Sequence, residues 1–410
     1  MEKQYLQEQI RSELLGSMDL SRDLSDEEIR GRIRRKVMES GRREHWTILE
    51  KQQMERDIFD SIRRLDVLQE LVDDPEVSEI MVNGPGHIFI EKGGRVMRYQ
   101  KTFSSPEKLL DVIQQIVARC NRVVNETMPI VDARLENGSR VNVVLPPVAI
   151  NGPILTIRRF PDHPFTMDDL VANGTLPEEI ADFLEKMVIC RENIFVSGGT
   201  SSGKTTFLNV LGDFIPRNER IITIEDSAEL NLRNIPNLVR LECRNANLEG
   251  LAPITIRDLI RTALRERPDR ILVGEVRSGE AVDMISAMNT GHDGSLSTGH
   301  ANSCQDMLKR LETMFLMAVD MPVDAIRRQI AAGIDLMVHL ERTGGGKRKL
   351  VSVEELVGYQ DGELVLNPIY TYRPKEDGHA EYWEKAGCLV HTEKYRKCFP
   401  GEKTGTDPGG

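Results

Sequence analysis

The fold of this 410-residue chain is decided by one stretch of sequence, Gly198-Gly199-Thr200-Ser201-Ser202-Gly203-Lys204-Thr205. The stretch matches the pattern G-x-x-x-x-G-K-[S/T] at every position. Its glycines let the backbone curl so that several N–H groups point at one anion, and a helix beginning at Lys204 directs its positive end at the same place. We therefore predict a phosphate-binding loop. In it the Lys204 ammonium reaches the β- and γ-phosphates of a nucleotide, and the Thr205 hydroxyl binds a magnesium ion.

The residues on both sides of the loop predict a strand, a loop and a helix in succession. Ile194–Val196 has the composition of a short buried strand, and an apolar helical pattern follows Thr206. The predicted nucleotide-binding residues are Gly198, Gly199, Thr200, Ser201, Ser202, Gly203, Lys204, Thr205 and Thr206. Further strands are predicted at 221–224, 271–273, 295–298 and 336–340, with a helix at 256–267. This alternation predicts an α/β domain with a mostly parallel sheet.

Two of the predicted strands end in acidic residues. Glu275 closely follows the apolar run Ile271–Val273, and Glu225 and Asp226 follow the strand at 221–224. The carboxyl ends of parallel strands lie beside a phosphate loop, where an acid can bind a magnesium-coordinated water or polarise the attacking water. We predict that Glu275 shares the magnesium site with Thr205 through water. Either one of the other two acids or Glu275 itself positions and activates the nucleophilic water.

Two of the eight histidines, His292 and His300, each follow a glycine and flank a short predicted strand. No further ligands stand at zinc spacing, so a zinc site is disfavoured. A lone histidine is usually a core residue, but the shared context favours phosphate sensing. Cys388, His391 and Cys398 have irregular spacing and no fourth ligand, and predict no metal site either.

The composition and the hydrophobic pattern of the chain change several times along its length. Residues 1–62 predict a helical extension, with a capping box at Ser25 to Glu28. Residues 63–160 predict an α+β domain, 161–188 a linker that passes into a helix, and 189–373 the nucleotide-binding domain. Residues 374–410 predict a C-terminal tail that is partly disordered, because its end is rich in glycine and proline.

Composition excludes several classes of protein. The net charge of −11 disfavours nonspecific nucleic-acid binding, and no apolar run approaches the about 20 residues that span a bilayer. The N-terminus lacks a secretory signal and the six cysteines show no disulfide framework, so we expect a cytoplasmic protein. One basic cluster is either a solvated helix face or a surface for anionic lipid or an acidic partner. Its members are Arg30, Arg32, Arg34, Arg35, Lys36, Arg42 and Arg43.

Taken in order, the motifs resemble those of the secretion and pilus ATPases of the type II/type IV superfamily. These families name them Walker A, Asp box, Walker B and His box. Here the last three are TIED at 223–226, RERPDRILVGEVR at 265–277, and TGH at 290–292 and 298–300. Upstream, DPEVSEIMVNG at 74–84 and DARLENGSRVN at 132–142 look most like the CpaF-like proteins of the Tad/Flp pilus branch. The resemblance covers about residues 65–372 and is weak over 1–60.

The resemblance implies a homo-hexameric ring in which an N-terminal α+β domain lies over a RecA-like motor domain. Arginines of the N-terminal domain then reach the phosphates of ATP. The implied catalytic residues are Glu275, Glu225, Lys204, His300, Arg134, Arg140, Arg158 and Arg159. ATP and Mg²⁺ are the implied cofactors. Gly299 departs from the family pattern, which often has leucine there, and this predicts a looser placement of His300.

The function implied by the resemblance is an ATP-hydrolysing motor for Tad/Flp pilus assembly or protein secretion. Such a motor works from the inner face of the cytoplasmic membrane, through a polytopic platform protein and without direct contact to nucleic acid. One alternative is the ATPase of a conjugation-type secretion system, and another is a nucleotide-dependent scaffold without turnover. A small-metabolite kinase is disfavoured because the sequence shows no acceptor-binding motif.

Overall fold

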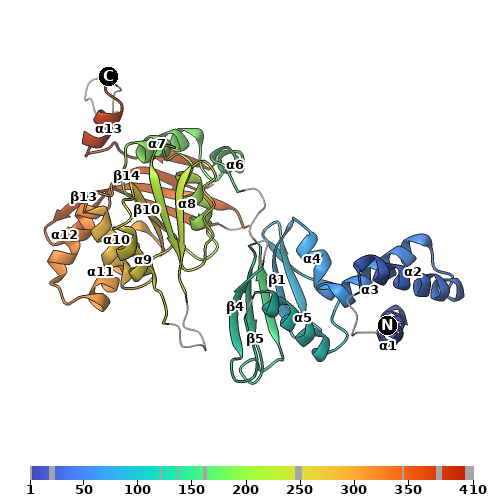
Figure 1. The fold of residues 1–410 in the computed structure, drawn as a ribbon. Helices are drawn as coiled ribbons and strands as arrows, with labels where there is room; N and C mark the ends of the chain where they lie inside the picture. Colours follow the sequence, from blue (N-terminus) through green and yellow to red (C-terminus); the bar gives the residue numbers. More distant parts are fainter. Residues whose placement is uncertain are drawn as a thin grey trace. The chain divides into compact units, whose positions relative to one another are not determined.

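The computed structural model describes residues 2–17, 24–120, 122–135, 138–159, 164–244, 252–343, 346–374 and 381–401. The chain divides into two compact units, Met1–Asp162 and His163–Gly410. Figure 1 draws the first unit from blue to green and the second from green to red. Within the described residues, no helix is both long and apolar enough to cross a membrane.

The first unit begins with a bundle of three helices, α1 (Glu2–Ser17), α2 (Asp26–Arg43) and α3 (Ile48–Arg63). The predicted capping box at Ser25 and Glu28 starts α2, and a second one, at Thr47 and Glu50, starts α3. Apolar residues at helical spacing face inward from the three helices, and Ile33, Ile58 and Phe59 are almost fully buried. The bundle occupies the interval in which we expected a helical extension.

Three members of the basic cluster on α2 make contacts within this bundle. The Arg30 guanidinium lies 3.6 Å above the centre of the Phe59 ring. Arg34 pairs with Glu55 at 3.2 Å and Lys36 with Glu13 at 2.7 Å. These contacts favour the interpretation of a solvated helix face over a dedicated binding surface. The side chain of Arg43 lies outside the described residues.

The rest of the first unit is an antiparallel sheet covered by a helix. The sheet order is β3-β2-β1-β6-β5-β4. The strands are β1 (Val77–Asn83), β2 (Ile88–Lys92), β3 (Arg95–Arg98), β4 (Ile130–Arg134), β5 (Arg140–Val144) and β6 (Ile154–Arg158). Helix α5 (Pro106–Arg119) buries its apolar face with the sheet, and the short α4 (Gln69–Asp73) precedes β1. The edge strands β3 and β4 were not predicted, because each is short and mostly solvent-accessible.

The second unit is built on a nine-stranded sheet of order β15-β14-β13-β12-β7-β11-β10-β8-β9. Neighbours from β12 to β9 are parallel, whereas β13, β14 and β15 join antiparallel. The parallel strands are β7 (Ile194–Gly198), β8 (Arg220–Glu225), β9 (Asn237–Glu242), β10 (Arg270–Val273), β11 (Leu296–His300) and β12 (Leu336–Arg342). The others are β13 (Arg348–Gln360), β14 (Glu363–Arg373) and β15 (Tyr382–Lys385). This architecture confirms the predicted α/β fold class.

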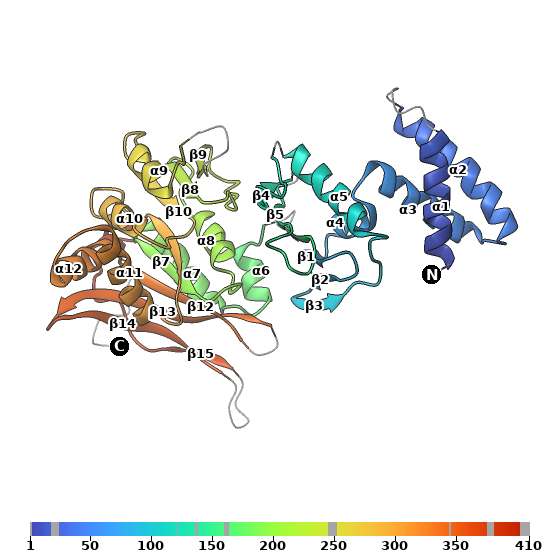
Figure 2. The ribbon, with the colours of Figure 1, turned by 90° about the horizontal axis from the view of Figure 1, so that it is seen from below.

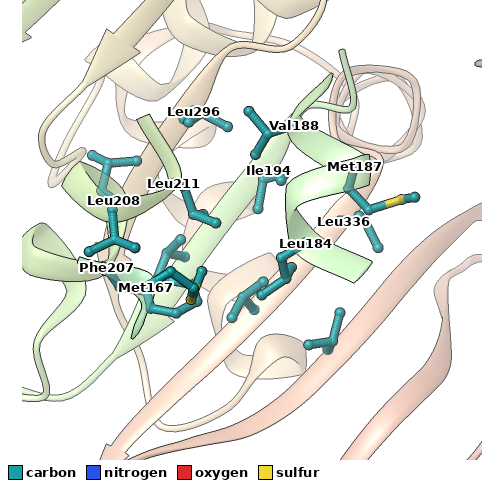
Figure 3. Packing of buried hydrophobic residues seen from close by; sticks show 14 of the residues in the cluster. Met167, Leu184, Met187, Val188, Ile194, Phe207, Leu208, Leu211, Leu296 and Leu336 are labelled. Carbon is teal, nitrogen blue, oxygen red and sulfur yellow. The ribbon is translucent and has the colours of Figure 1, made fainter. Parts of the chain in front are cut away.

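Helices cover both faces of this sheet, so its central strands are apolar on both sides. In β7, Ile194 and Val196 face one cluster while Phe195 faces the other. The first cluster includes α6 (Met167–Ala172), α7 (Glu178–Ile189), α8 (Lys204–Gly212) and α13 (Glu393–Cys398). The second includes α9 (Ile256–Ala263), α10 (Glu280–Met288), α11 (Cys304–Ala318) and α12 (Val323–Gly333). Figure 2 shows the sheet between these helices, and Figure 3 shows Leu184 and Ile194 packing in the first cluster.

The structure changes the expected boundaries at both ends of the second unit. The interval 161–188, expected as a linker that passes into a helix, carries α6 and most of α7, and the apolar residues Met167, Leu184 and Met187 belong to the sheet's core. In the expected tail, β15 pairs with β14, and α13 buries Tyr395. The rest of the expected disorder, at 375–380 and 402–410, lies outside the described residues.

Candidate functional site: the phosphate loop and the strand ends beside it

The phosphate loop leaves the central strand β7 and enters α8 at Lys204. Ser201 and Gly203 adopt left-handed backbone conformations, with φ of 58° and 95°. Gly198 has no room for a side chain, because a Cβ would collide with the carbonyl oxygen of Leu340 on β12 and with the Ser202 hydroxyl. The buried Lys204 folds back over the loop and donates from Nζ to the Gly199 carbonyl at 2.8 Å. The sequence thus forms the strand, tight loop and helix that we predicted from it.

A continuous string of polar contacts runs from the loop across the neighbouring strand ends. Lys204 Nζ lies 3.2 Å from Nδ1 of His300, and His300 Nε2 lies 2.8 Å from Oε1 of Glu275. The other Glu275 oxygen accepts from Arg277 Nη2 at 2.8 Å, and Arg277 Nη1 lies 3.4 Å from Asp226. Five side chains are joined in this way, and consecutive members of the string stand between 2 and 96 residues apart in the sequence.

The string follows directly from the parallel register of the sheet. His300 at the end of β11 pairs with Gly198 at the end of β7, and Val273 at the end of β10 pairs with Ile224 on β8. The carboxyl ends of four adjacent strands therefore meet at one edge of the sheet, next to the phosphate loop. Ligands of open α/β sheets bind at this edge.

His300 is held as a neutral imidazole between a cation and an acid. Burial lowers its pKa, and the nearby Lys204 ammonium lowers it further, while Glu275 opposes both. A neutral ring accepts from Lys204 at Nδ1 only when the proton resides on Nε2, toward Glu275. The alignment with Glu275 falls short of a hydrogen bond, and Oε1 has no hydrogen-bond partner among the described residues.

The structure corrects the expectation about Gly299 and distinguishes the surroundings of the two histidines. A Cβ on Gly299 would lie 2.8 Å from Met307 and 3.1 Å from Phe195, so glycine here reflects tight packing and not a loose histidine. The two histidines are also separated. His300 ends β11 beside the phosphate loop, whereas His292 precedes β11, at the opposite edge of the sheet, with Nδ1 3.3 Å from the Ala287 carbonyl.

Glu225 is the most buried acid at this edge, with 3% of its surface exposed. Burial raises its pKa to about 7, although hydrogen bonds from the backbone N–H groups of Glu229 and Leu230 to Oε1 oppose the rise. Oε2 has no hydrogen-bond partner within the described ranges. A Cβ on Gly274 would lie only 2.9 Å from Glu225 Cγ, so glycine at 274 leaves room for the Glu225 side chain.

Burial of Glu225 predicts a pH-dependent stability. The folded pKa of about 7 exceeds the ordinary value of 4.5, so the folded state holds this proton more tightly and loses stability as pH rises from about 4.5 to 7. Glu225→Gln removes the titration and keeps an oxygen for both backbone donors. We expect urea unfolding to show the variant gaining on the order of 3 kcal/mol relative to wild type between pH 5 and 8. A difference that stays constant over this range would contradict the assignment.

The donor set at this edge fits a magnesium ion. Mg²⁺ prefers oxygen ligands and usually keeps several waters. The half-buried Thr205 lies in the first turn of α8, and Glu225 and Glu275 each have a buried oxygen with no hydrogen-bond partner in the described part of the chain. Thr205 and Glu275, the predicted pair, would hold the ion and its waters.

The four predicted arginines of the first unit separate into two groups. Arg134, Arg140 and Arg158 are direct cross-strand neighbours on β4, β5 and β6, and their side chains share one face of the sheet. Their strand neighbours Ala133, Val141 and Ile157 point the other way into the core. Arg159 does not belong to this row, since it donates to the backbone carbonyl of Asp74. We refer to Arg134, Arg140 and Arg158 as the arginine row.

Two arginines at the edge of the site have no role in the predictions made from the sequence. Arg277 lies inside the Walker B motif quoted above. Its position two residues after Glu275 could have indicated a contact with that acid. Arg348 donates from Nε to the Ser201 carbonyl at 3.1 Å, and no local pattern indicates a contact across 147 residues. Next to the loop, a hollow of about 700 Å³ is bordered by Thr200, His300 and the exposed Lys309 and Arg310 of α11.

Comparison with solved structures shows which proteins share this fold. The ATPase DotB of Legionella pneumophila matches with a TM-score of 0.51 and 23% identity, over 72% of this chain and 80% of DotB. The pilus retraction motor PilT with bound ADP matches with a TM-score of 0.52 and 22% identity, over 72% of this chain and 83% of PilT. At these identities the likeness concerns the fold alone.

Sequence comparison shows the family. Rv3659c of Mycobacterium tuberculosis (strain H37Rv), named as a conjugal transfer protein, is 34% identical over 298 residues, 71% of this chain and 84% of the relative. The type IV secretion system protein VirB11 of Brucella suis biovar 1 is 33% identical over 303 residues, 67% of this chain and 84% of the relative. A family model described as type II/IV secretion system protein matches residues 63–394. The chain therefore belongs to the family of type II/IV secretion system proteins.

Proposed function

We propose that the second unit binds ATP with magnesium at the loop 198–205 and hydrolyses it to drive a type II/IV secretion machine. One observation carries this proposal: the string of contacts that joins Lys204, His300, Glu275 and Arg277 beside the phosphate loop. A loop that only binds a nucleotide does not need a neutral imidazole in contact with its lysine and a carboxylate in contact with that imidazole. This arrangement suits a site that holds a phosphate, senses it and directs a water at it.

Each side chain has a separate task in the proposed hydrolysis. Backbone N–H groups of the loop and the Lys204 ammonium hold the β- and γ-phosphates. Thr205 and Glu275 would hold magnesium and its waters, and the ion would supply positive charge beside the phosphate oxygens. His300 contacts both Lys204 and Glu275, so we assign it the sensing of the γ-phosphate. Arg277 holds the remaining Glu275 oxygen in place.

Glu275 is a better candidate than Glu225 for orienting the attacking water. Glu275 lies in the string of contacts that includes Lys204. One of its oxygens accepts from Arg277, and the other has no hydrogen-bond partner among the described residues. Glu225 directs one oxygen to its own loop, and its raised pKa leaves it about half protonated near pH 7. A protonated acid cannot accept a proton from water. We therefore propose Glu225 as a second acid that supports the geometry of the edge.

The first experiment separates a motor from a scaffold that binds nucleotide without turnover. Purified full-length protein is incubated with ATP, and phosphate release is measured with magnesium and with EDTA. We expect multiple turnovers that need magnesium. Tight binding of ATP with no phosphate release would favour the scaffold instead.

The arginine row is the proposed contribution of the first unit to the active site. Like charges directly opposite each other destabilise a sheet, so three adjacent arginines indicate an anion-binding role. Arg140→Gln, at the centre of the row, is expected to lower kcat/KM for ATP by about 10- to 100-fold, since it removes one positive charge from the phosphates. The matched control is Arg95→Gln, on the exposed edge strand β3 of the same sheet, which should stay within about twofold. Equal effects of both changes would rule out a specific role for the row.

Two kinds of machine remain as candidates for the motor. The CpaF-like motifs favour Tad/Flp pilus assembly, whereas the relatives named for conjugal transfer and for VirB11 favour a conjugation-type secretion system. In either case we propose a homo-hexamer that works on a polytopic platform protein at the inner face of the cytoplasmic membrane. Light scattering with and without nucleotide tests the ring. Affinity purification from membranes of the source cell tests the machine, because pilin-like subunits and conjugation components give different co-purifying proteins.

A further inference from the structure

Arg348, the first residue of β13, lies against the phosphate loop from a distant part of the chain. Its Nε donates to the Ser201 carbonyl at 3.1 Å. Its Cδ lies 3.2 Å from the point that a Cβ on Gly203 would occupy. These two loop residues are also the ones with left-handed backbone conformations. Arg348 therefore touches the loop at both of its conformationally demanding positions.

The hydrogen bond to Ser201 controls the direction of a loop N–H group. In a trans peptide the carbonyl and the next N–H point in opposite directions. When Arg348 holds the Ser201 carbonyl, the Ser202 N–H is turned to the other side, where it approaches the Gly199 carbonyl at 3.4 Å. Gly199 is also the residue whose carbonyl accepts from Lys204. The N–H group that Arg348 orients is thus one of those inside the loop.

The strand that carries Arg348 is firmly anchored behind it. The next residue, Lys349, is buried and donates to the Gly174 carbonyl at 2.6 Å and to Glu381 at 2.5 Å. The backbone N–H of Leu350 donates to the Thr175 carbonyl at 2.9 Å. Because the start of β13 is held by buried partners, the Arg348 side chain leaves a rigid element and its position is well defined.

The guanidinium charge of Arg348 is not neutralised by an acidic side chain of the described residues. The side chain is exposed, and among those residues its two terminal nitrogens make no hydrogen bond and no ion pair. An arginine that only stabilised the fold would be expected to pair with an acid. Here the guanidinium leaves a positive charge on the wall of a loop built for an anion.

We propose that Arg348 is a positioning residue of the phosphate loop. It holds the Ser201–Ser202 peptide in the phosphate-binding orientation, and so raises the affinity for nucleotide without taking part in the hydrolysis step. This inference rests on the proposed function, since it assumes that the loop binds a nucleotide. Its expected signature is a change in the dissociation constant and in KM, with kcat nearly unchanged.

The test is a titration of the full-length protein with a fluorescent ADP analogue in the presence of magnesium. Arg348→Ala is expected to weaken binding about tenfold, which corresponds to about 1.4 kcal/mol, and to change kcat for ATP less than about threefold. The matched control is Lys347→Ala, which removes an exposed charge from the neighbouring residue and should stay within about twofold. Arg348→Lys keeps the charge without the Nε donor and should fall between wild type and Arg348→Ala.

Stability measurements separate positioning from a structural role. Without nucleotide, Arg348→Ala should melt within a few degrees of wild type, whereas the stabilisation by added MgADP should shrink in line with the weaker binding. Should Arg348→Ala not fold, the comparison of Arg348→Lys with Lys347→Ala gives the answer. The inference would be overturned if the Arg348 variants bound nucleotide with the wild-type dissociation constant while Lys204→Ala had lost nucleotide binding. Wild-type protein that binds no nucleotide would instead overturn the proposed function.

Discussion

Lys204→Ala is expected to abolish measurable ATP turnover, with a fall in kcat/KM of roughly a thousandfold or more. The ammonium is the one loop group that can place a full positive charge on the β- and γ-phosphates, and charge-assisted contacts of this kind are among the strongest in an active site. Phosphate release and binding of a fluorescent ADP analogue measure the two effects. Both should be lost, because Lys204 contributes to binding as well as to the transition state.

A second variant and a spectroscopic readout protect this prediction from a folding artefact. Lys204→Met keeps the apolar stem in its buried place and should show the same loss of activity. In both variants the pKa of His300 should rise towards its ordinary value, because the Lys204 ammonium no longer adds to the lowering caused by burial. NMR titration of the histidines would detect that rise. Full activity in both lysine variants would remove the loop from the catalytic site.

Glu275→Gln is expected to have the second large effect, a fall in kcat of about a thousandfold with nucleotide affinity within about threefold of wild type. The amide keeps an oxygen for Arg277 but has no negative charge with which to orient the attacking water or the waters of magnesium. Binding survives because the loop and Lys204 are unchanged. Single-turnover measurement of ATP cleavage, beside the binding titration, separates the two quantities.

The neighbouring sheet edge offers a matched control for this change. Glu341 is exposed near the end of β12, the strand on the other side of β7, and Glu341→Gln should leave kcat within about twofold. The comparison with Glu225→Gln is also informative, because we assign Glu225 a supporting role. If Glu225→Gln stopped hydrolysis while Glu275→Gln did not, the two acids would have to exchange roles.

The fold was predictable from local features of the sequence. The glycines at 198, 199 and 203, the apolar runs at 194–196 and 271–273, and their alternation with helices predict a parallel sheet with a phosphate loop at its edge. Several strands escaped prediction, and three of them, β3, β4 and β9, are largely exposed and carry charged residues, so their apolar signal is weak. The start of the second unit was not predicted, because prolines and glycines at 161–188 suggested a linker. Packing in the core assigns α6 and α7 to the second unit.

Local patterns in the sequence determined which residue types stand at the site. They placed a lysine and a threonine after a glycine loop, acids after apolar strands and a histidine beside them. They could not determine the partners of these side chains. Register brought His300 next to Gly198 and thus against Lys204, and burial made Glu225 an acid with a pKa near 7. Strand pairing also separated the arginine row from Arg159, and the start of β13 brought Arg348 to the loop. The physical reason is that a pattern of short period encodes which face of a strand or helix is buried, whereas a contact between residues about a hundred positions apart exists only after the strands have paired.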